Sequence, residues 1–290
     1  IKDNLKTFLK AQDTFKDYDF EGSGMNILLD VLAYNTHYQS FNANMLGNEM
    51  FLDSSSLRSS AVSHAKTLGY EVRSATASYA TVNVTLNSHS STTATMPAGT
   101  KFTTTLDGNS FQFVTSQDYT STLAAGDIVY SDVTIYEGSY IKTRYTVNSN
   151  DVNQRFILED ARTDTTTLKV EVQTSSGDST TTTYTKATDI TQLTGSSEVY
   201  FLQEVENGKH EVYFGDGVVS KALTNGNIVI LSYIVTNKSE ANNASVFANS
   251  AAIAGNTNVT VTTVAAAIGG AEPESISSIK FAAPLDYAAQ

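Results

Sequence analysis

The stretch that decides the fold is residues 20–72, FEGSGMNILLDVLAYNTHYQSFNANMLGNEMFLDSSSLRSSAVSHAKTLGYEV. In its first half, large apolar and aromatic side chains recur at alternating steps of four and three residues. This spacing, about 3.5 residues on average, keeps a row of side chains facing a partner helix. The row, which we call the seam, consists of Ile27, Val31, Tyr34, Tyr38, Phe41 and Met45.

Three leucines near the start of this predicted helix, Leu28, Leu29 and Leu32, lie off the seam. They make the first turns apolar on a second side, and a helix with two apolar sides cannot bury both against a single layer. We therefore expect one side to pack on this chain and the other on a different chain. Tyr34 and Tyr38 favour an interface, because tyrosine joins a large apolar body to a hydroxyl. Plain core remains the alternative interpretation of the seam.

Residues 1–16 repeat the spacing on a smaller scale, in a row of Ile1, Leu5, Phe8, Gln12 and Phe15. A helix of about this length is marginal in water by itself, so it needs a partner. It could fold back on its own domain or bundle with other chains, and the residues leave both possibilities open. The predicted partner interface comprises the six seam residues together with Leu5, Phe8 and Phe15.

A second, shorter helix is expected after the long one. Asp53 and Ser54–Ser56 offer side-chain oxygens that can cap its N-terminus. Gly69 is suited to end it in the left-handed conformation. Its apolar row consists of Leu57, Ala61, Ala65 and Leu68. Residues 1–75 are therefore predicted to form an N-terminal helical region that bundles with other subunits.

Beyond Tyr70 the helical spacing gives way to alternating polar and apolar residues, rich in Thr, Ser, Val and Tyr, which favours half-buried strands. Turn sequences such as Asn207-Gly208 and Asn225-Gly226 separate these strands. No helical pattern interrupts them, so residues 76–236 are predicted to form a mainly antiparallel β domain, a sandwich or barrel-like structure. The expected strands are 79–86, 101–105, 110–115, 128–136, 140–147, 166–173, 199–205, 210–214 and 228–236.

The remainder of the chain is less regular. The Thr180–Thr183 run is expected to be a loop or an edge hairpin. Residues 237–256, rich in Ala, Asn and Ser, are expected to cross the molecule, and 258–264 alternate like another strand. Pro273-Glu274-Ser275 then opens a last helix. We predict that residues 237–290 comprise this crossing segment and the start of a C-terminal α/β domain.

The predicted fold class is α+β: an N-terminal helical arm, a mainly antiparallel β region and a short α/β C-terminal portion. The chain begins at Ile1 rather than at a methionine, and it stops at Gln290 inside the expected last helix. We therefore expect the C-terminal portion to continue in a longer protein.

Composition excludes several classes of function. The formal net charge is −12 and the pI is near 4.7, whereas binding to nucleic acid or to an anionic membrane depends on Lys and Arg. No apolar run approaches the roughly 20 residues that span a bilayer. Cysteine is absent, so the chain forms neither disulfides nor thiolate metal sites. We predict no nucleic-acid partner and no membrane insertion.

Two patterns superficially suggest a ligand site. Gly215-Asp216-Gly217 resembles a glycine-rich phosphate loop, but such loops lie between a strand and a helix. Because β-rich sequence flanks this one on both sides, we expect a tight turn. The four histidines include no pair at metal-ligand spacing, and we expect hydrogen-bonded surface roles for those on helices, His37 and His64; the others are His89 and His210.

The acidic residues give no better case for catalysis. Glu204 and Glu206 share one face of a strand, as a pair of glycosidase carboxylates might across a cleft. They adjoin Asn207-Gly208 at a hairpin end, so we interpret them as solvated charges. The sequence contains no GxSxG motif and no cysteine nucleophile. We predict no catalytic residue, no metal site and no cofactor.

The helical stretch also carries linked motifs at ordered spacing. They are Ala33-Tyr34-Asn35, Asn48-Glu49-Met50-Phe51-Leu52, Arg58 and Ala65-Lys66-Thr67-Leu68-Gly69-Tyr70. Together they resemble the N-terminal signature of the baseplate wedge proteins (the baseplate J family) of contractile-tailed bacteriophages.

Later blocks are similar to the same family, namely MPAGTKF (96–102), VYFLQEVENGKHEVYFGDGVVSKALTNGNIVILSYIVT (199–236) and GGAEPESISSIKFAAP (269–284). Residues 115–195 are the least recognisable. One departure is Ser220, which stands where related blocks often have glycine. It removes a permissive backbone position and puts the turn geometry there in doubt.

The resemblance implies a structural, non-catalytic protein of the virion, a wedge subunit of the tail baseplate that is assembled in the host cytoplasm. It implies that two copies join another wedge protein through a helical bundle. The wedges would then form a ring around the tail hub and relay receptor engagement to sheath contraction. A second class remains open, a β-rich adhesin or fibre protein that binds a surface glycan. That class would account for the acidity and the Ser/Thr-rich strands, but not for the patterned helices.

Overall fold

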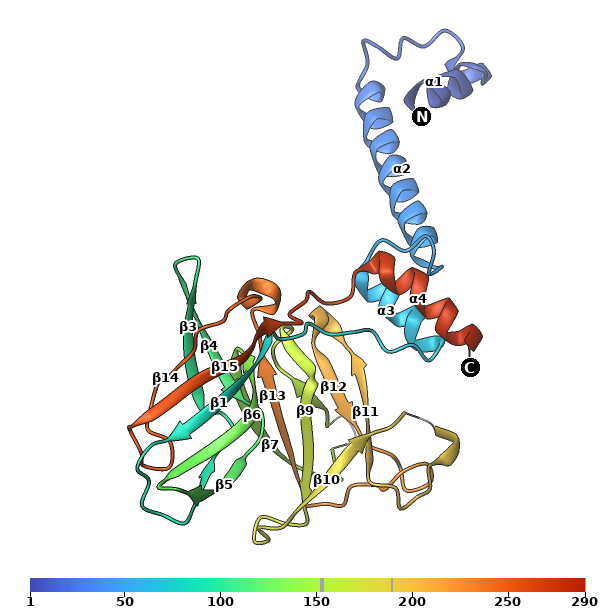
Figure 1. The fold of residues 1–290 in the computed structure, drawn as a ribbon. Coiled ribbons are helices and arrows are strands. Elements are labelled where there is room, and N and C mark those ends of the chain that lie inside the picture. Colours follow the sequence, from blue (N-terminus) through green and yellow to red (C-terminus); the bar gives the residue numbers. More distant parts are fainter. Residues whose placement is uncertain (152–153, 189, 290) are drawn as a thin grey trace.

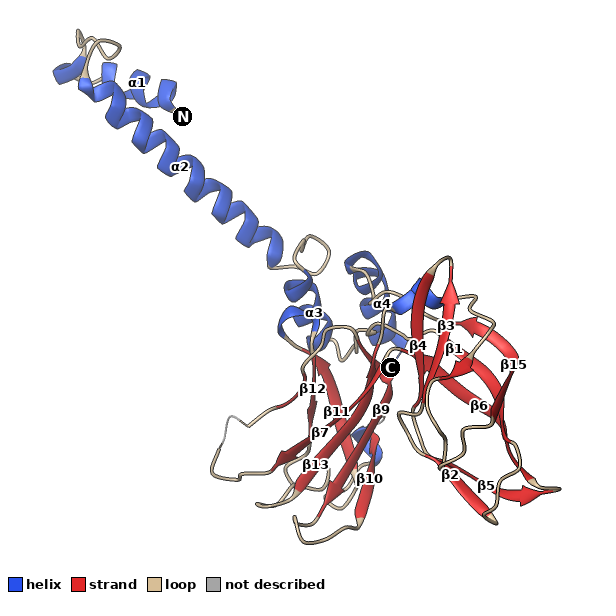
Figure 2. Ribbon diagram, turned by 90° about the vertical axis from the view of Figure 1, so that its left-hand side faces the viewer, coloured by secondary structure: helices blue, strands red, loops and turns tan. Residues whose placement is uncertain are grey.

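The computed structural model describes residues 1–151, 154–188 and 190–289. A helical arm projects from a body made of two β-sheets, and two short helices lie where the arm meets the body (Figure 1). The side view in Figure 2 shows the arm extending away from both sheets. None of the helices in the described ranges is both long and apolar enough to cross a membrane.

The arm consists of α1 (Lys2–Lys10), a 3-10 turn (Asp13–Phe15) and α2 (Gly24–Glu49). α1 folds back against the first turns of α2. An ion pair supports this contact, with Lys2 Nζ 2.6 Å from the carboxylate of Asp30. Beyond these turns α2 extends without a neighbouring element until it reaches the body.

Two further helices, α3 (Arg58–Thr67) and α4 (Ile276–Ala289), pack against each other. We call this pair the head. Although its helices are far apart in sequence, they share a hydrophobic core of Ala61, Val62, Ala65, Val72, Ile279 and Ala283. Gly69 ends α3 in the left-handed conformation, with φ of 79°, as predicted.

The start of α3 differs from the prediction. Its N-cap residue is Leu57, which cannot cap with its side chain, and neither Asp53 nor Ser54–Ser56 takes that role. Instead the carboxylate of Glu49, the last residue of α2, accepts hydrogen bonds from the backbone N–H groups of Ser56 at 2.8 Å and Leu57 at 3.3 Å. The hydroxyl of Ser56 donates to the same carboxylate. This bond contributes most, and together with the backbone bonds it lowers the pKa of Glu49 to about 2.

The first sheet has eight strands in the order β14-β3-β4-β6-β1-β15, with β5 joining β6 to β2. Its alternating inward side chains build one core that includes Phe102, Phe113 and Ile135. The strands are β1 (Tyr79–Leu86), β2 (Thr93–Met96), β3 (Lys101–Leu106), β4 (Asn109–Thr115), β5 (Tyr119–Ala124), β6 (Asp127–Glu137), β14 (Ala248–Asn249) and β15 (Val259–Ile268).

The second sheet has seven strands in the order β7-β13-β9-β10-β11-β12-β8 and curls into a near-barrel. Neighbours are antiparallel except for β10 and β11, which are parallel. A separate core fills it, with Leu158, Val212 and Leu231 fully buried. The strands are β7 (Ser139–Thr146), β8 (Phe156–Leu158), β9 (Thr163–Gln173), β10 (Thr181–Lys186), β11 (Val199–Glu204), β12 (His210–Tyr213) and β13 (Ile228–Val235).

The chain passes between the two sheets at Glu137 and Gly138. Gly138 has φ of 124°, and a Cβ there would lie 2.1 Å from the carbonyl oxygen of Val235, so glycine is required. The buried carboxylate of Glu137 accepts hydrogen bonds from the Thr236 hydroxyl and from the backbone and side-chain N–H groups of Asn237. These bonds link the last residue of β6 in the first sheet to the residues that follow β13 in the second sheet.

The predicted α+β class, with N-terminal helices before a mainly antiparallel β region, is confirmed. Every expected strand is present, but β2, β5, β8 and β14 were not predicted. For the Thr180–Thr183 run, the hairpin alternative is confirmed: residues 181–183 belong to β10, which forms a hairpin with β9, and β11 joins β10 only at Thr185 and Lys186. Thr181, Thr182 and Thr183 pair with β9. A run of identical polar residues shows no alternation, so the sequence did not decide between a loop and a strand there.

The C-terminal segment 237–290 returns to elements formed earlier in the chain. β15 pairs with β1 along most of its length, and α4 packs on α3. In the described residues, the segment therefore completes the first sheet and the head. A domain boundary at residue 236 would separate β15 from the sheet that it completes. The division of the chain into domains 1–75, 76–236 and 237–290 stays a prediction.

Candidate functional site

The seam is exposed along the whole of α2. Exposure of its six side chains ranges from 41% for Met45 to 68% for Ile27. All 26 residues of α2 are described, and Leu29 is the one buried side chain among them. A helix that is apolar on its surface and uncovered by its own chain is typical of an interaction site.

The arm divides the predicted interface residues into two groups. Leu5 and Phe15 are half-buried, and Phe15 contacts the rings of Tyr18 and buried Phe20 at centroid distances of 5.8 and 6.3 Å. Phe8 is exposed, like the seam. In this chain α1 thus covers the side of α2 that carries Leu29 and leaves the seam open.

The second apolar side expected from the three leucines is also mostly uncovered. Leu29 is buried, whereas Leu28 and Leu32 are exposed. Two large side chains near the end of the arm, Leu46 and Phe51, are exposed as well. The arm therefore offers apolar surface on more than one side.

The electrostatics of α2 suit it to burial by a partner. Its charged residues are Asp30 and Glu49, near the two ends of the helix. Asp30 is paired with Lys2, and Glu49 is committed to the turn that precedes α3. The central turns carry amides and hydroxyls, with Tyr34 and Tyr38 in ring contact at 4.8 Å. Apart from the imidazole of His37, covering these turns removes no acidic or basic side chain from water, and burying an unpaired charge is the most expensive part of burial.

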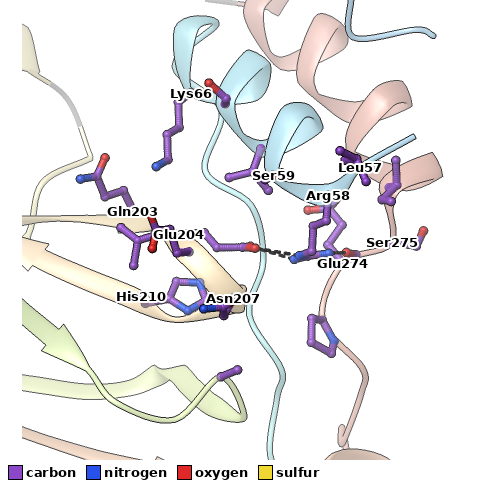
Figure 3. Close-up of a pocket in the computed structure, with 18 of the residues that line it drawn as sticks. Leu57, Arg58, Ser59, Lys66, Gln203, Glu204, Asn207, His210, Glu274 and Ser275 are labelled. Carbon is purple, nitrogen blue, oxygen red and sulfur yellow. Dashed lines mark hydrogen bonds and ion pairs between the residues drawn. The ribbon is translucent and has the colours of Figure 1, made fainter. Parts of the chain in front are cut away.

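A second cluster of polar side chains lies where the head meets the second sheet (Figure 3). From α3, Arg58 donates to the carboxylate of Glu204 on β11 through Nε at 2.7 Å and Nη2 at 2.8 Å. Its Nη1 donates to the backbone carbonyl of Glu274, just before α4. The prediction that Glu204 is a solvated charge is wrong, since its side chain is buried; Glu206 is exposed as expected.

Glu274 is the second buried carboxylate of this cluster. It accepts hydrogen bonds from the hydroxyls of Tyr70 and Ser278 and from the backbone N–H of Arg73. Burial by itself would raise the pKa of Glu274, but these hydrogen bonds, that of Ser278 foremost, lower it below the ordinary value. Glu274 therefore holds together the two segments that lead from the body to the head.

The histidines form no metal site. His64 Nε2 lies 2.9 Å from the carbonyl oxygen of Glu49 and is half-buried, as expected of a hydrogen-bonded role, and His37 is exposed. His210 is 2% exposed, and burial lowers its pKa to about 4. Throughout the described ranges, no three His, Asp or Glu side chains are grouped so that they could hold a metal ion.

The Gly215-Asp216-Gly217 stretch lies at a bend in the loop between β12 and β13, and strands flank this loop on both sides as predicted. Gly217 has φ of 91°, and its N–H donates to the carbonyl oxygen of Ser220 at 2.9 Å. Ser220, which stands in a position often held by glycine in related blocks, is fully buried. Its hydroxyl lies 2.0 Å from where a Cβ on Gly215 would be, so the turn accepts serine here only because Gly215 makes room.

Sequence patterns could have revealed Glu204. It shares the inward face of β11 with Tyr200 and Leu202, two residues apart along the strand, and both are buried. Arg58 belongs to one of the linked motifs, but its sequence context does not indicate which residue it contacts. The missing information was that these two residues, distant in sequence, meet.

Two family models of baseplate wedge proteins match parts of this chain. The family model for the helical domain of gp6-like baseplate wedge proteins matches residues 1–70, which contain α1, α2 and α3. The model for the third domain of the bacteriophage baseplate wedge protein gp6 matches residues 141–250, which contain nearly all of the second sheet.

The baseplate wedge protein gp6 of Enterobacteria phage T4 is 28% identical to this chain over 309 aligned positions. The match covers 97% of the chain and 45% of the T4 protein, so the chain spans a little under half the length of that relative. A solved structure of the anti-feeding prophage baseplate covers 99% of the chain, and the chain covers 59% of that protein, at 14% identity and a TM-score of 0.32. A likeness this weak carries no argument.

The sequence matches extend over the arm, the second sheet and, in the T4 relative, almost the whole chain. The linked motifs around α2 and α3 lie inside the matched helical domain. The chain therefore belongs to the gp6-like family of bacteriophage baseplate wedge proteins, which are structural and non-enzymatic components of contractile tails.

Proposed function

We propose that this chain is a wedge subunit that assembles with other chains through the exposed face of its helical arm. The observation that carries the proposal is the seam, six large side chains at coiled-coil spacing that no part of the described chain covers. With Phe8 of α1 they form the proposed interface, while Leu5 and Phe15 shape the arm from within.

The partners proposed for the arm are a second copy of this chain and another wedge protein, in one helical bundle. The spacing of the seam and the neutral centre of α2 support helical partners rather than a flat surface. A bundle also suits a helix with apolar surface on more than one side. Wedges joined in this way would form a ring around the tail hub.

In this proposal the two parts of the chain have different mechanical roles. The arm holds the wedge together, and the two sheets contact neighbouring subunits and transmit the signal for sheath contraction. The separation of the cores supports this division, because the seam can enter a bundle without disturbing either sheet.

Hydrogen exchange with size-exclusion chromatography tests the proposal. The isolated chain should self-associate or show weak amide protection across residues 24–49, because isolated helices depend on packing for most of their stability. Addition of the neighbouring wedge proteins should give a larger complex and protect those amides. A clean monomer with strong protection throughout α2, unchanged by the other wedge proteins, would refute the proposal.

A further inference from the structure

The head is attached to the body in a limited way. Its core is built from α3, α4 and the residues beside them, and no strand of either sheet contributes to it in the described part of the chain. Two segments, residues 68–78 and 269–275, run side by side from the body to the head (Figure 1). They are bridged by the backbone hydrogen bonds between Thr76 and Ala271.

Open space lies on both sides of the contact between α3 and the second sheet. On one side is a cavity of about 960 Å³, lined by α3, the start of α4 and the β11–β12 hairpin. On the other side a hollow of about 380 Å³ is lined by residues that include Tyr70, Phe201 and Tyr213. Both spaces are partly open to solvent, so clefts flank the contact between α3 and the sheet.

Between these spaces the Arg58–Glu204 pair crosses the joint with a buried carboxylate, and a second, more exposed pair joins Lys186 of β10 to Glu71 beside the head. Arg58 and Glu204 meet in a bidentate geometry, and the Glu204 side chain is only 3% exposed.

Among the other cations that line the cavity, Arg155 pairs with Glu211 and Arg162 with Asp160. Lys66 of α3 also lines it but does not pair directly with Glu204. The imidazole of His210 lines the same cavity, and its burial favours the neutral form. Arg58 is the cation in direct contact with the carboxylate of Glu204.

We propose that the Arg58–Glu204 pair is a latch that fixes the orientation of the head, and with it the arm, relative to the second sheet. When the latch opens, the head turns as a unit about the two segments 68–78 and 269–275. The cavity provides the room for α3 to move, and the head keeps its own core during the motion. This motion involves contacts within one chain and does not depend on which partner covers the seam.

Arg58 also reaches the carbonyl oxygen of Glu274, which links the latch to the base of α4. The side chain of Arg58, the first residue of α3, therefore also holds the residues just before α4. Loss of a partner from a buried ion pair leaves the other charge uncompensated, so an opened latch favours movement of Arg58 and Glu204 toward water. The head should therefore have two distinct orientations, one with the pair closed and one with it open, rather than a continuous range.

Distance measurements between spin labels test the latch. Because the chain has no cysteine, Ala288→Cys on α4 and Thr183→Cys on β10 introduce two specific labelling sites at exposed positions. Labelled protein is diluted with excess unlabelled chain, so that self-association adds no distances between labels. The starting chain should give a single narrow distance distribution.

Glu204→Gln preserves the size of the side chain and removes its charge. We expect a broadened or two-peaked distribution, with both sheets still folded by circular dichroism. The matched control is Glu159→Gln, which removes an exposed ion pair with Lys209 on the same sheet and should leave the distribution narrow.

Arg58→Gln opens the latch from the head and leaves the strands of the sheet untouched, so it decides the matter if Glu204→Gln unfolds β11. A narrow distribution in Arg58→Gln, equal to that of the starting chain, would overturn the proposal. A starting chain whose distribution is already as broad as that of the variants would overturn it too, because the pair would then hold nothing in place.

Discussion

Among the described residues, the longest helix and a strongly apolar strand have opposite surroundings. β13 has the sequence IVILSYIV and lies between β7 and β9, with seven of its eight residues buried. α2 has a row of equally large side chains and buries Leu29 alone. Both segments would be assigned to a core by hydrophobicity. The difference shows that one is covered by its own chain and the other is left for a different chain.

The reason lies in what covers the two apolar sides of each element. One side of β13 faces the core of the second sheet through residues such as Leu231, and the other meets the first sheet, where Ile234 packs with Ala77 and Val114. α2 has only α1 beside it, and α1 is too short to cover more than its first turns. Apolar surface that no layer of the chain covers is available for assembly.

The sharpest test of this contrast is the double substitution Tyr38→Ser and Phe41→Ser. Each removes a large apolar side chain worth roughly 1.5–3 kcal/mol when buried. In an interface the loss falls on association, where ~1.4 kcal/mol changes affinity tenfold. We expect about two to four orders of magnitude weaker assembly, measured by co-purification with the wedge partner, with the β signal in circular dichroism retained.

The matched control changes Asn35 and Gln39 to serine on the polar side of the same turns, where the cost should be much smaller. Unimpaired co-purification of the Tyr38 and Phe41 variant would mean that the seam is not an interface. Loss of the β signal would mean that the arm and the sheets unfold together.

The opposite result is expected in the first sheet. Phe113 is fully buried and packs edge-to-face on Phe247 at a centroid distance of 4.9 Å. Phe113→Ala should lower the free energy of unfolding by about 3–5 kcal/mol, measured by urea denaturation. Val264→Ala, at an exposed position on β15, should stay within about 0.5 kcal/mol. An equal effect of the two would contradict the assigned core.

A smaller effect, dependent on pH, should come from His210. Its pKa is about 4 in the folded chain because burial disfavours the charged form, against roughly 6.5 when unfolded. Between these values the unfolded chain binds a proton that the folded chain does not, so stability is full above pH ~6.5, falls as the pH drops to ~4, and levels off below. The difference amounts to about 3 kcal/mol.

Urea midpoints measured across this pH range check the prediction. His210→Gln should remove most of the loss between the two pKa values, whereas His37→Gln, at an exposed position on the arm, should preserve it. The idea fails if the pH dependence of the His210 variant matches that of the starting chain.

The smallest effect is expected at the surface pair of Lys209 and Glu159, 2.8 Å apart on the second sheet. Exposed ion pairs contribute about 0–1 kcal/mol. Glu159→Gln should therefore leave both assembly and the urea midpoint close to those of the starting chain. A loss as large as that of Phe113→Ala would show that this edge of the sheet is itself covered in the folded or assembled protein.

The sequence was a reliable guide wherever a local pattern carries the structure. The spacing of the seam predicted α2, alternation predicted most strands, and Gly69 marked the end of α3. Short strands such as β8 were missed because three residues are too few to show a period. The expected cap of α3 is wrong because Leu57 occupies the N-cap position, and the turn before it is held by the carboxylate of Glu49 from the preceding helix.

The sequence by itself determined the helical arm, the β-rich body, the absence of a catalytic pattern and the resemblance to baseplate wedge proteins, because each rests on residues close together in the chain. The tertiary structure alone decided that β15 returns to β1, that Glu204 is buried against Arg58, and that α1 covers only one side of α2. These outcomes depend on contacts between distant segments. Burial and pairing are properties of the surrounding fold, and no spacing of neighbouring residues encodes which distant segment will supply them.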